Sequence, residues 1–281
     1  MKSTEVEPVV DRTFELGENP LWFDERGVYL WTDITAGRLW EYDRGTGAVR
    51  CRYQGPPVGG FTIQHDGSLL LFRVDDIAVL DPGDGVRVIA PLEDDRAVRF
   101  NDVIAAPDGS VLAGTIGRDD SSGGVYHLAR DGTLRPLFHR TGISNGMGFS
   151  PDLRTLYWTC STTREIWRFD YDAREGLVDV ASAARIFRGD RSDPGGAVPD
   201  GLTVDAAGDL WSARWEGSCV VRHAADGRVL GRVGVPTPKV TSVTFGGPDL
   251  DELLITTSGG PVYRCRPGAR GRPEFRSAID A

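Results

Sequence analysis

The sequence predicts an all-β protein with the architecture of a six-bladed β-propeller. A short polar segment occurs six times, with copies about 40 residues apart over most of the chain, a spacing typical of propeller blades. Each copy is followed by a turn and then by a strand rich in β-branched and aromatic residues. Helical signals are scarce, because 36 glycines and 17 prolines interrupt the chain and no long stretch has helical apolar spacing.

The repeated segment is clearest at Ser144-Asn145-Gly146-Met147-Gly148-Phe149, where a polar residue precedes a small residue and then an apolar one. The equivalent positions of the six copies are Glu18, Gly59, Asn101, Asn145, Asp200 and Thr241. The interval between the fourth and fifth copies is longer than the others. It therefore contains an insertion around residues 191–197, which we expect to overhang the same end of the channel as Asp200.

Each unit continues with further strands. The expected second strands are 28–32, 68–72, 111–115, 156–159, 210–213 and 253–257. Third strands are expected at 37–43, 124–128, 165–170, 219–223 and 261–265, and a fourth, outer strand would complete each unit. Asp-Gly turns between strands are strong hairpin signals. A β-sandwich would not repeat its sequence six times and the coils of a β-solenoid are shorter, so the propeller is favoured.

Closure of the ring requires a strand from one end of the chain to complete the blade begun by the other. Residues 8–14 are positioned to pair with the last unit, which would leave no open edge. No polar or Pro/Gly-rich break separates two cores within the repeats. We therefore predict one domain over residues 1–281.

Composition limits the classes of partner. The net charge of −9 and the pI near 5.0 argue against nucleic acid and anionic membrane surfaces, which require a basic face. No secretory signal is visible at Met1–Pro8, and no apolar run approaches the about 18 residues of a membrane span. Four widely spaced cysteines without a C-x-x-C motif favour a reducing cytoplasm. No obligate protein partner is evident.

The repeat predicts a cluster of oxygen donors. Equivalent positions of a propeller lie on a ring around its axis, so Glu18, Asn101, Asn145 and Asp200 should meet at one channel mouth. Carboxylate and amide oxygens suit Ca²⁺, Mg²⁺ or Mn²⁺, and two carboxylates facing each other would repel without a cation between them. Asn and Asp also cap turns at strand starts. Their recurrence at the repeat's own position favours a metal site.

The same segments resemble a known family. Gly17-Glu18-Asn19-Pro20, Arg99-Phe100-Asn101-Asp102, Ser144-Asn145-Gly146 and Pro199-Asp200-Gly201 are similar to signature segments of the SMP-30/gluconolactonase/regucalcin-like propellers. The similarity covers essentially the whole chain. It implies a six-bladed propeller that uses one divalent cation (Ca, Mg, Mn, Zn or Fe) to hydrolyse a small lactone, with a sugar lactone as the expected substrate.

The resemblance also assigns roles to residues. Glu18, Asn145 and Asp200 would be the metal ligands, and Arg99 and Asn101 would bind the substrate. A divalent cation polarises a carbonyl and lowers the pKa of a bound water. Asp200 would take the proton of that water as general base, and Arg99 would help to stabilise the developing oxyanion.

Some residues depart from the family pattern. Asn19 and Glu216 stand where Gly is usual, and Cys160 stands where an Asp is common. Cys160, Trp215 and Glu216 are possible pocket residues. Cys160 could be a nucleophile, but no His lies in register to activate it, which favours a buried, inert thiol. The alternative functions are another metal-dependent reaction on a hydroxylated or natural-product substrate, and a non-catalytic calcium-binding propeller.

Overall fold

The computed structural model describes residues 5–190 and 197–280, and in these residues it is almost entirely β-structure. They form 24 strands and one short 3₁₀ helix, η1 (Asp24–Arg26). The predicted insertion around 191–197 falls almost wholly outside the described residues. Within them, no helix is long and apolar enough to cross a membrane.

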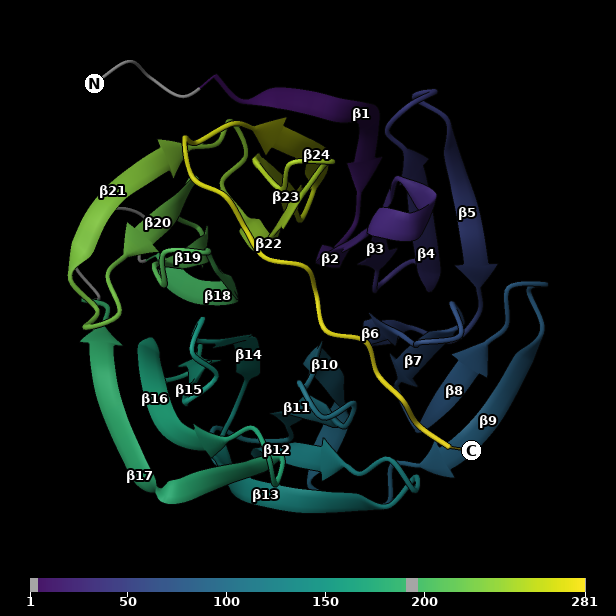
Figure 1. The fold of residues 1–281 in the computed structure, drawn as a ribbon, viewed down its shortest axis with the longest axis vertical. Coiled ribbons are helices and arrows are strands. Elements are labelled where there is room, and N and C mark those ends of the chain that lie inside the picture. The colour runs from purple at the N-terminus through teal and green to yellow at the C-terminus, as the bar shows by residue number, and fades with distance from the viewer. Residues whose placement is uncertain (1–4, 191–196, 281) are drawn as a thin grey trace.

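Six four-stranded antiparallel sheets are arranged around a central axis, which confirms the predicted propeller (Figure 1). Blade 1 contains β2 (Gly17–Phe23), β3 (Val28–Asp33), β4 (Arg38–Asp43) and β5 (Val49–Gln54). Blade 2 contains β6 (Val58–Ile63), β7 (Leu69–Arg73), β8 (Asp76–Leu80) and β9 (Val86–Pro91). Blade 3 contains β10 (Ala97–Ala105), β11 (Val111–Gly117), β12 (Gly123–Leu128) and β13 (Leu134–Thr141).

The second half of the ring repeats this order from the axis outward. Blade 4 contains β14 (Ser144–Phe149), β15 (Thr155–Cys160), β16 (Glu165–Asp172) and β17 (Leu177–Arg188). Blade 5 contains β18 (Val198–Val204), β19 (Leu210–Trp215), β20 (Cys219–His223) and β21 (Val229–Gly234). Blade 6 contains β22 (Val240–Gly246), β23 (Glu252–Thr257), β24 (Gly260–Cys265) and, from the N-terminal end, β1 (Glu7–Phe14).

The core lies between neighbouring blades. Inner strands such as β6, β14 and β22 are buried along their whole length, because a blade packs on each face. Aromatic rings join the blades: Phe72 and Phe100 meet edge to face at 5.2 Å, as do Trp211 and Phe245 at 5.6 Å. Outer strands such as β9 are largely exposed. The second strands β3 and β7 are also buried along their whole length, and these are the strands that appear as apolar runs in the sequence.

The N-terminal strand closes the ring as predicted. β1 pairs antiparallel with β24, and Pro8 lies opposite Tyr263. Phe14 at its end is fully buried and packs edge to face on Trp31 and Trp40 of blade 1. Closure therefore joins the first and last blades both through backbone pairing and through an aromatic contact.

The C-terminal tail, residues 266–280, crosses one face of the propeller (Figure 1). Its hydrogen bonds reach the turns or strands of every blade. The partners, from blade 1 to blade 6, are Asp24, Ile63, Gly109, Ser150, Ala206 and Leu250. The tail therefore covers the end of the channel that all six inner strands approach with their C-terminal halves.

Candidate active site

The inner strand of each blade carries a β-bulge at the repeated position. The breaks in register fall between Glu18 and Leu21, Val58 and Gly60, Phe100 and Val103, Asn145 and Met147, Pro199 and Leu202, and Val240 and Ser242. A bulge inserts an extra residue and redirects the side chains around it. The alternation of an ordinary strand is therefore interrupted at the mouth of the channel, where neighbouring residues of one strand can both face the axis.

Four of the six ring positions bring polar side chains together. Glu18, Asn101, Asn145 and Asp200 are each at most 6% exposed. Asn101 Nδ2 donates to Asn145 Oδ1 at 3.1 Å, and the Asn145 side chain is hydrogen-bonded to Asp200. Glu18 lies close enough to Asp200 for the two carboxylates to repel each other. The structure thus assembles the four predicted donors.

The two remaining ring positions have packing roles. A Cβ atom on Gly59 would lie 2.0 Å from the carbonyl oxygen of Phe100, so only glycine fits between β6 and β10. Thr241 Oγ1 lies 2.6 Å from the carbonyl oxygen of Gly17 and donates to it. These positions join neighbouring inner strands rather than supplying donors to the ring.

Hydrogen bonds fix the orientation of the Asn145 amide. The Ser161 hydroxyl donates to the carbonyl of Pro199 at 2.6 Å, so it is left to accept from Asn145 Nδ2 at 2.9 Å. Asn145 Oδ1 is therefore turned toward the ring, where it accepts one bond from Asn101. An amide oxygen has a second lone pair, which remains available to a cation.

Arg99 places a positive charge among the acids. Its Nη1 donates to Asn101 Oδ1 at 2.7 Å and to the carbonyl of Phe100 at 2.8 Å. Burial lowers the pKa of Arg99, and the charges of Glu18, Asp102 and Asp200 act in the opposite direction. The oxygen of Asn101 accepts from a positively charged guanidinium and that of Asn145 from a neutral amide, so Asn145 is the amide better suited to bind a cation.

Three buried carboxylates at the mouth have raised pKa values. Burial, then the charges of Asp102 and Asp200, raise the pKa of Glu18 well above its usual range. Burial, then the charge of Asp102, do the same to the pKa of Asp200. Burial raises the pKa of Asp102 to about 7, although Arg99 opposes the shift. Arg99 alone does not balance these groups, so a divalent cation would favour their ionised forms.

The donor set fits a hard divalent cation. Asp200 Oδ1 is buried and has no hydrogen-bond partner in the described part of the chain, so it is available as a ligand. Two carboxylates and one amide oxygen match the preference of Ca²⁺, Mg²⁺ or Mn²⁺ and leave positions for water and substrate. No group of three or more His, Cys, Asp or Glu side chains forms a metal cluster within the described residues. The amide of Asn145 would therefore be an essential third donor.

Residues 16–259 match the family model described as the SMP-30/gluconolactonase/LRE-like region. The chain belongs to this SMP-30/gluconolactonase family. It is 44% identical to pentonolactonase XacC of Haloferax volcanii, over 96% of this chain and 97% of that protein. It is 32% identical to 6-deoxy-6-sulfogluconolactonase of Pseudomonas putida, over 89% of this chain and 86% of that one.

A solved structure agrees over the whole fold. A calcium-binding protein, regucalcin, from Agrobacterium tumefaciens superposes with a TM-score of 0.91 at 26% identity. The match covers 98% of this chain and 97% of that one. The resemblance drawn from the sequence is therefore confirmed.

The three possible pocket residues of this SMP-30/gluconolactonase chain lie in different environments. Cys160 is buried with its Sγ 3.1 Å from Thr141 Oγ1, in a cluster with Met147 and Trp158. Trp215 is half-buried at the end of β19. Lys239 lies 5.0 Å from the ring centre of Trp215 and 3.7 Å from the exposed carboxylate of Glu216. Glu216 is thus on the rim, and Cys160 packs in the core.

Sequence reasoning missed three residues of the site. Asp102 follows Asn101 directly, and ordinary strand alternation would point it away from the axis; the bulge in β10 is what brings it there. Ser161 orients Asn145 from the next strand of the blade. Asn19 adopts a left-handed backbone with φ of 45°, and its Oδ1 accepts from the backbone N–H of Phe61. Asn19 therefore links β2 to β6.

Proposed function

We propose that this member of the SMP-30/gluconolactonase family is a divalent-metal-dependent lactonase that opens a small sugar lactone. The buried ring of Glu18, Asn145 and Asp200 carries this proposal, because its charge and free oxygen atoms suit a cation. The similarity to a pentonolactonase and to a 6-deoxy-6-sulfogluconolactonase supports lactone hydrolysis as the reaction. The substrate is a small molecule, and the ring beside Arg99 is its proposed binding site.

Glu18, Asn145 and Asp200 would hold the cation, and Arg99 and Asn101 would bind the substrate. Oxygen donors alone favour Ca²⁺, Mg²⁺ or Mn²⁺ over the softer Zn²⁺. The likeness to a calcium-binding regucalcin supports Ca²⁺ as the first cation to test. When bound, the cation supplies Lewis-acid polarisation of the lactone carbonyl.

The chain's own groups would complete the reaction. The carboxylate of Asp200 would accept a proton from the attacking water. The water oxygen bonds to the carbonyl carbon, and the guanidinium of Arg99 stabilises the negative charge on the carbonyl oxygen. The ring C–O bond would then break, and its oxygen would take up the proton held by Asp200. The product is the open hydroxy acid.

Acid release from a panel of aldonolactones tests this function directly. Chelator-stripped protein should be inactive, and each of Ca²⁺, Mg²⁺, Mn²⁺ and Zn²⁺ is added back in turn. Glu18→Gln keeps the shape of the side chain but removes its charge, so it should weaken metal binding and turnover together. Turnover by stripped protein, or a fully active Glu18→Gln, would exclude the proposed role of the ring.

Metal binding without turnover of any lactone would instead favour one of two alternatives, another metal-dependent reaction or a non-catalytic calcium-binding propeller.

We propose a reducing cytoplasm as the setting. All four cysteines lie in the described residues and none of them forms a disulfide there, which supports this setting.

A further inference from the structure

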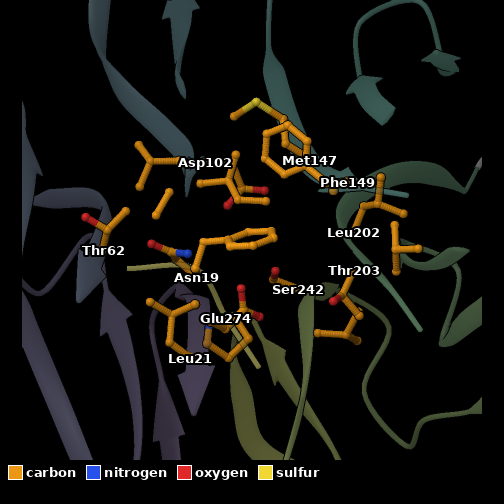
Figure 2. Close-up of a pocket in the computed structure, with 18 of the residues that line it drawn as sticks. Asn19, Leu21, Thr62, Asp102, Met147, Phe149, Leu202, Thr203, Ser242 and Glu274 are labelled. Carbon is orange, nitrogen blue, oxygen red and sulfur yellow. The ribbon is translucent and has the colours of Figure 1, made fainter. Parts of the chain in front are cut away.

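A polar cavity lies in the channel between the ring of donors and the C-terminal tail. Its volume is about 80 Å³, and it is lined by the inner strands of all six blades and by residues 272–275 of the tail. A single water needs about 10–15 Å³ measured in this way, so the cavity can hold several waters or a partly hydrated ion. Figure 2 shows this space, with Asn19, Thr62 and Ser242 among its polar walls.

Two carboxylates from different parts of the chain face this cavity. Asp102 comes from β10, and Glu274 comes from the tail, on the opposite side of the cavity (Figure 2). Asp102 is 6% exposed, and its carboxylate accepts no hydrogen bond within residues 5–190 and 197–280. Glu274 accepts one bond, from Thr244 Oγ1 at 3.2 Å. Both acids therefore present oxygen atoms to the cavity that other protein groups leave largely unused.

The nearest basic side chains are engaged elsewhere. Arg99 donates to Asn101 and Phe100 at the mouth. Arg272 donates to the carbonyl of Ser150 and lies over the ring of Phe275. Arg276 pairs with Asp24 and Glu25 on the outer face of blade 1. Within the described residues, none of these arginines forms a hydrogen bond or an ion pair with Asp102 or Glu274. Arg99 acts on Asp102 only through its charge, as Arg276 and Arg272 do on Glu274. A buried acid, Asp102, and a half-buried one, Glu274, that no basic group contacts directly are costly unless a cation enters or they remain protonated.

We propose that this cavity is a second cation site, in which Asp102 and Glu274 hold a divalent cation of the Ca²⁺ type with water as the remaining ligand. Hard carboxylate oxygens and hydroxyl-lined walls suit this ion. The ligands differ from those proposed for the ring. The site does not depend on lactone hydrolysis, and the ion bound there would stabilise the fold without taking part in the reaction.

The cation would join the tail to the inner strands. Glu274 lies in the segment that contacts all six blades, and Asp102 lies in β10, one residue after Asn101. An ion between them would fix the tail over the channel. It would also hold the part of β10 that follows the ring residue Asn101. Binding to the folded state alone should raise the melting temperature of the protein with increasing Ca²⁺ concentration.

Counting bound Ca²⁺ in stripped and dialysed protein tests the proposal. Wild-type protein should bind two equivalents, Glu274→Gln one, Asp200→Asn one, and the double variant none. Glu93 is an exposed glutamate on the surface, so Glu93→Gln makes the same chemical change elsewhere and should retain two. Glu274→Gln should keep full lactone turnover at saturating Ca²⁺ and lose part of the melting-temperature rise that Ca²⁺ produces.

The outcomes separate this proposal from the proposed function. One equivalent in the wild type, or an unchanged count in Glu274→Gln, would overturn the second site. Two equivalents without any lactone turnover would overturn the function alone. Asp102→Asn provides a second test, because it removes the other ligand by an isosteric change. If Glu274→Gln does not fold, an unchanged count of two in Asp102→Asn would still exclude the site.

Discussion

Asp200 is a residue whose environment opposes folding and suits the role proposed for it. Its carboxylate is buried, one oxygen has no hydrogen-bond partner among the described residues, and Asp102 and Glu18 lie close by. A carboxyl whose folded pKa is raised binds its proton more tightly in the folded state. Its ionisation therefore removes stability as the pH rises through the range between its unfolded and folded pKa values. A bound cation would offset this cost.

Asp200→Asn should accordingly separate stability from activity. At pH 7 without metal, the variant should melt at a higher temperature than the wild type, because an unfavourable buried charge is gone. With saturating Ca²⁺ the order should reverse, and turnover should fall by about 10²–10⁴-fold. Differential scanning calorimetry with and without metal, together with acid release, measures both effects. A metal-free variant that melts below the wild type would contradict the electrostatic argument.

His223 is a buried residue with one clear protonation state. Gly227 offers only a carbonyl oxygen, 2.9 Å from Nδ1, and Arg214 offers only N–H donors, 2.6 Å from Nε2. The neutral imidazole therefore carries its proton on Nδ1. Burial, followed by the charge of Arg214, lowers the pKa of His223 from its ordinary 6.5 to about 4.

This shift predicts a loss of stability on acidification. Between pH 6.5 and about 4 the unfolded chain takes up a proton that the folded protein does not, so the free energy of unfolding falls by up to about 3 kcal/mol. Glutamine at this position can reproduce one donor and one acceptor without titrating. Urea unfolding should therefore show a shallower acid slope over this range in His223→Gln. Equal slopes in the two proteins would contradict the assignment.

At the scale of the strand, the bulge is the feature that builds the site. It lets neighbouring residues face the axis, and glycine often follows the ring position because the next inner strand is close. A Cβ on Gly201 would lie 2.1 Å from Ser242 Oγ and 2.5 Å from Ser242 Cβ. The position of Asp200 thus depends on the contact between β18 and β22.

Gly201→Ala should lower the free energy of unfolding by about 1–3 kcal/mol through overpacking. It should also reduce turnover, because Asp200 is displaced. Gly231 is the matched control: it lies on β21, has no positive φ, and a Cβ there would meet nothing within 4 Å. Chemical denaturation and acid release should both find Gly231→Ala close to the wild type. Equal effects of the two substitutions would argue against strand contact as the cause.

The same strands show what sequence can and cannot predict. Asn101 and Asp200 could be identified because they recur at a fixed position of a repeat, and a repeat places equivalent residues on one ring. Asp102 could not, because its direction depends on a bulge that the apolar pattern does not encode. Glu274 lies outside the repeats, and its position follows from tail contacts with turns of different blades. Local patterns thus predicted the fold and the ring, and long-range contacts determined the cavity.

For the molecule as a whole, ring closure should make the six blades unfold together. Each blade shares its core with two neighbours, and β1 couples blade 6 to blade 1 through Phe14. The single domain predicted from the sequence would accordingly unfold in one step. Shared cores also imply that a destabilising substitution at the closure lowers the stability of all six blades.

Phe14→Ala tests this coupling. Removing a fully buried ring from between two tryptophans should cost about 3–5 kcal/mol, as for other large-to-small core changes. The whole calorimetric transition should move to lower temperature as one peak. A new, separate transition for the closing blade would instead show that the propeller is not one cooperative unit.

The pairing of β1 with β24 has a consequence for biosynthesis. A ribosome releases Pro8 before it makes blades 1 to 5, but the partner residue Tyr263 emerges only after those five blades. β1 therefore remains unpaired while blades 1 to 5 are synthesised, and the ring can close only after β24 has been made. Such an exposed strand edge is the kind of surface on which unfinished chains associate with one another.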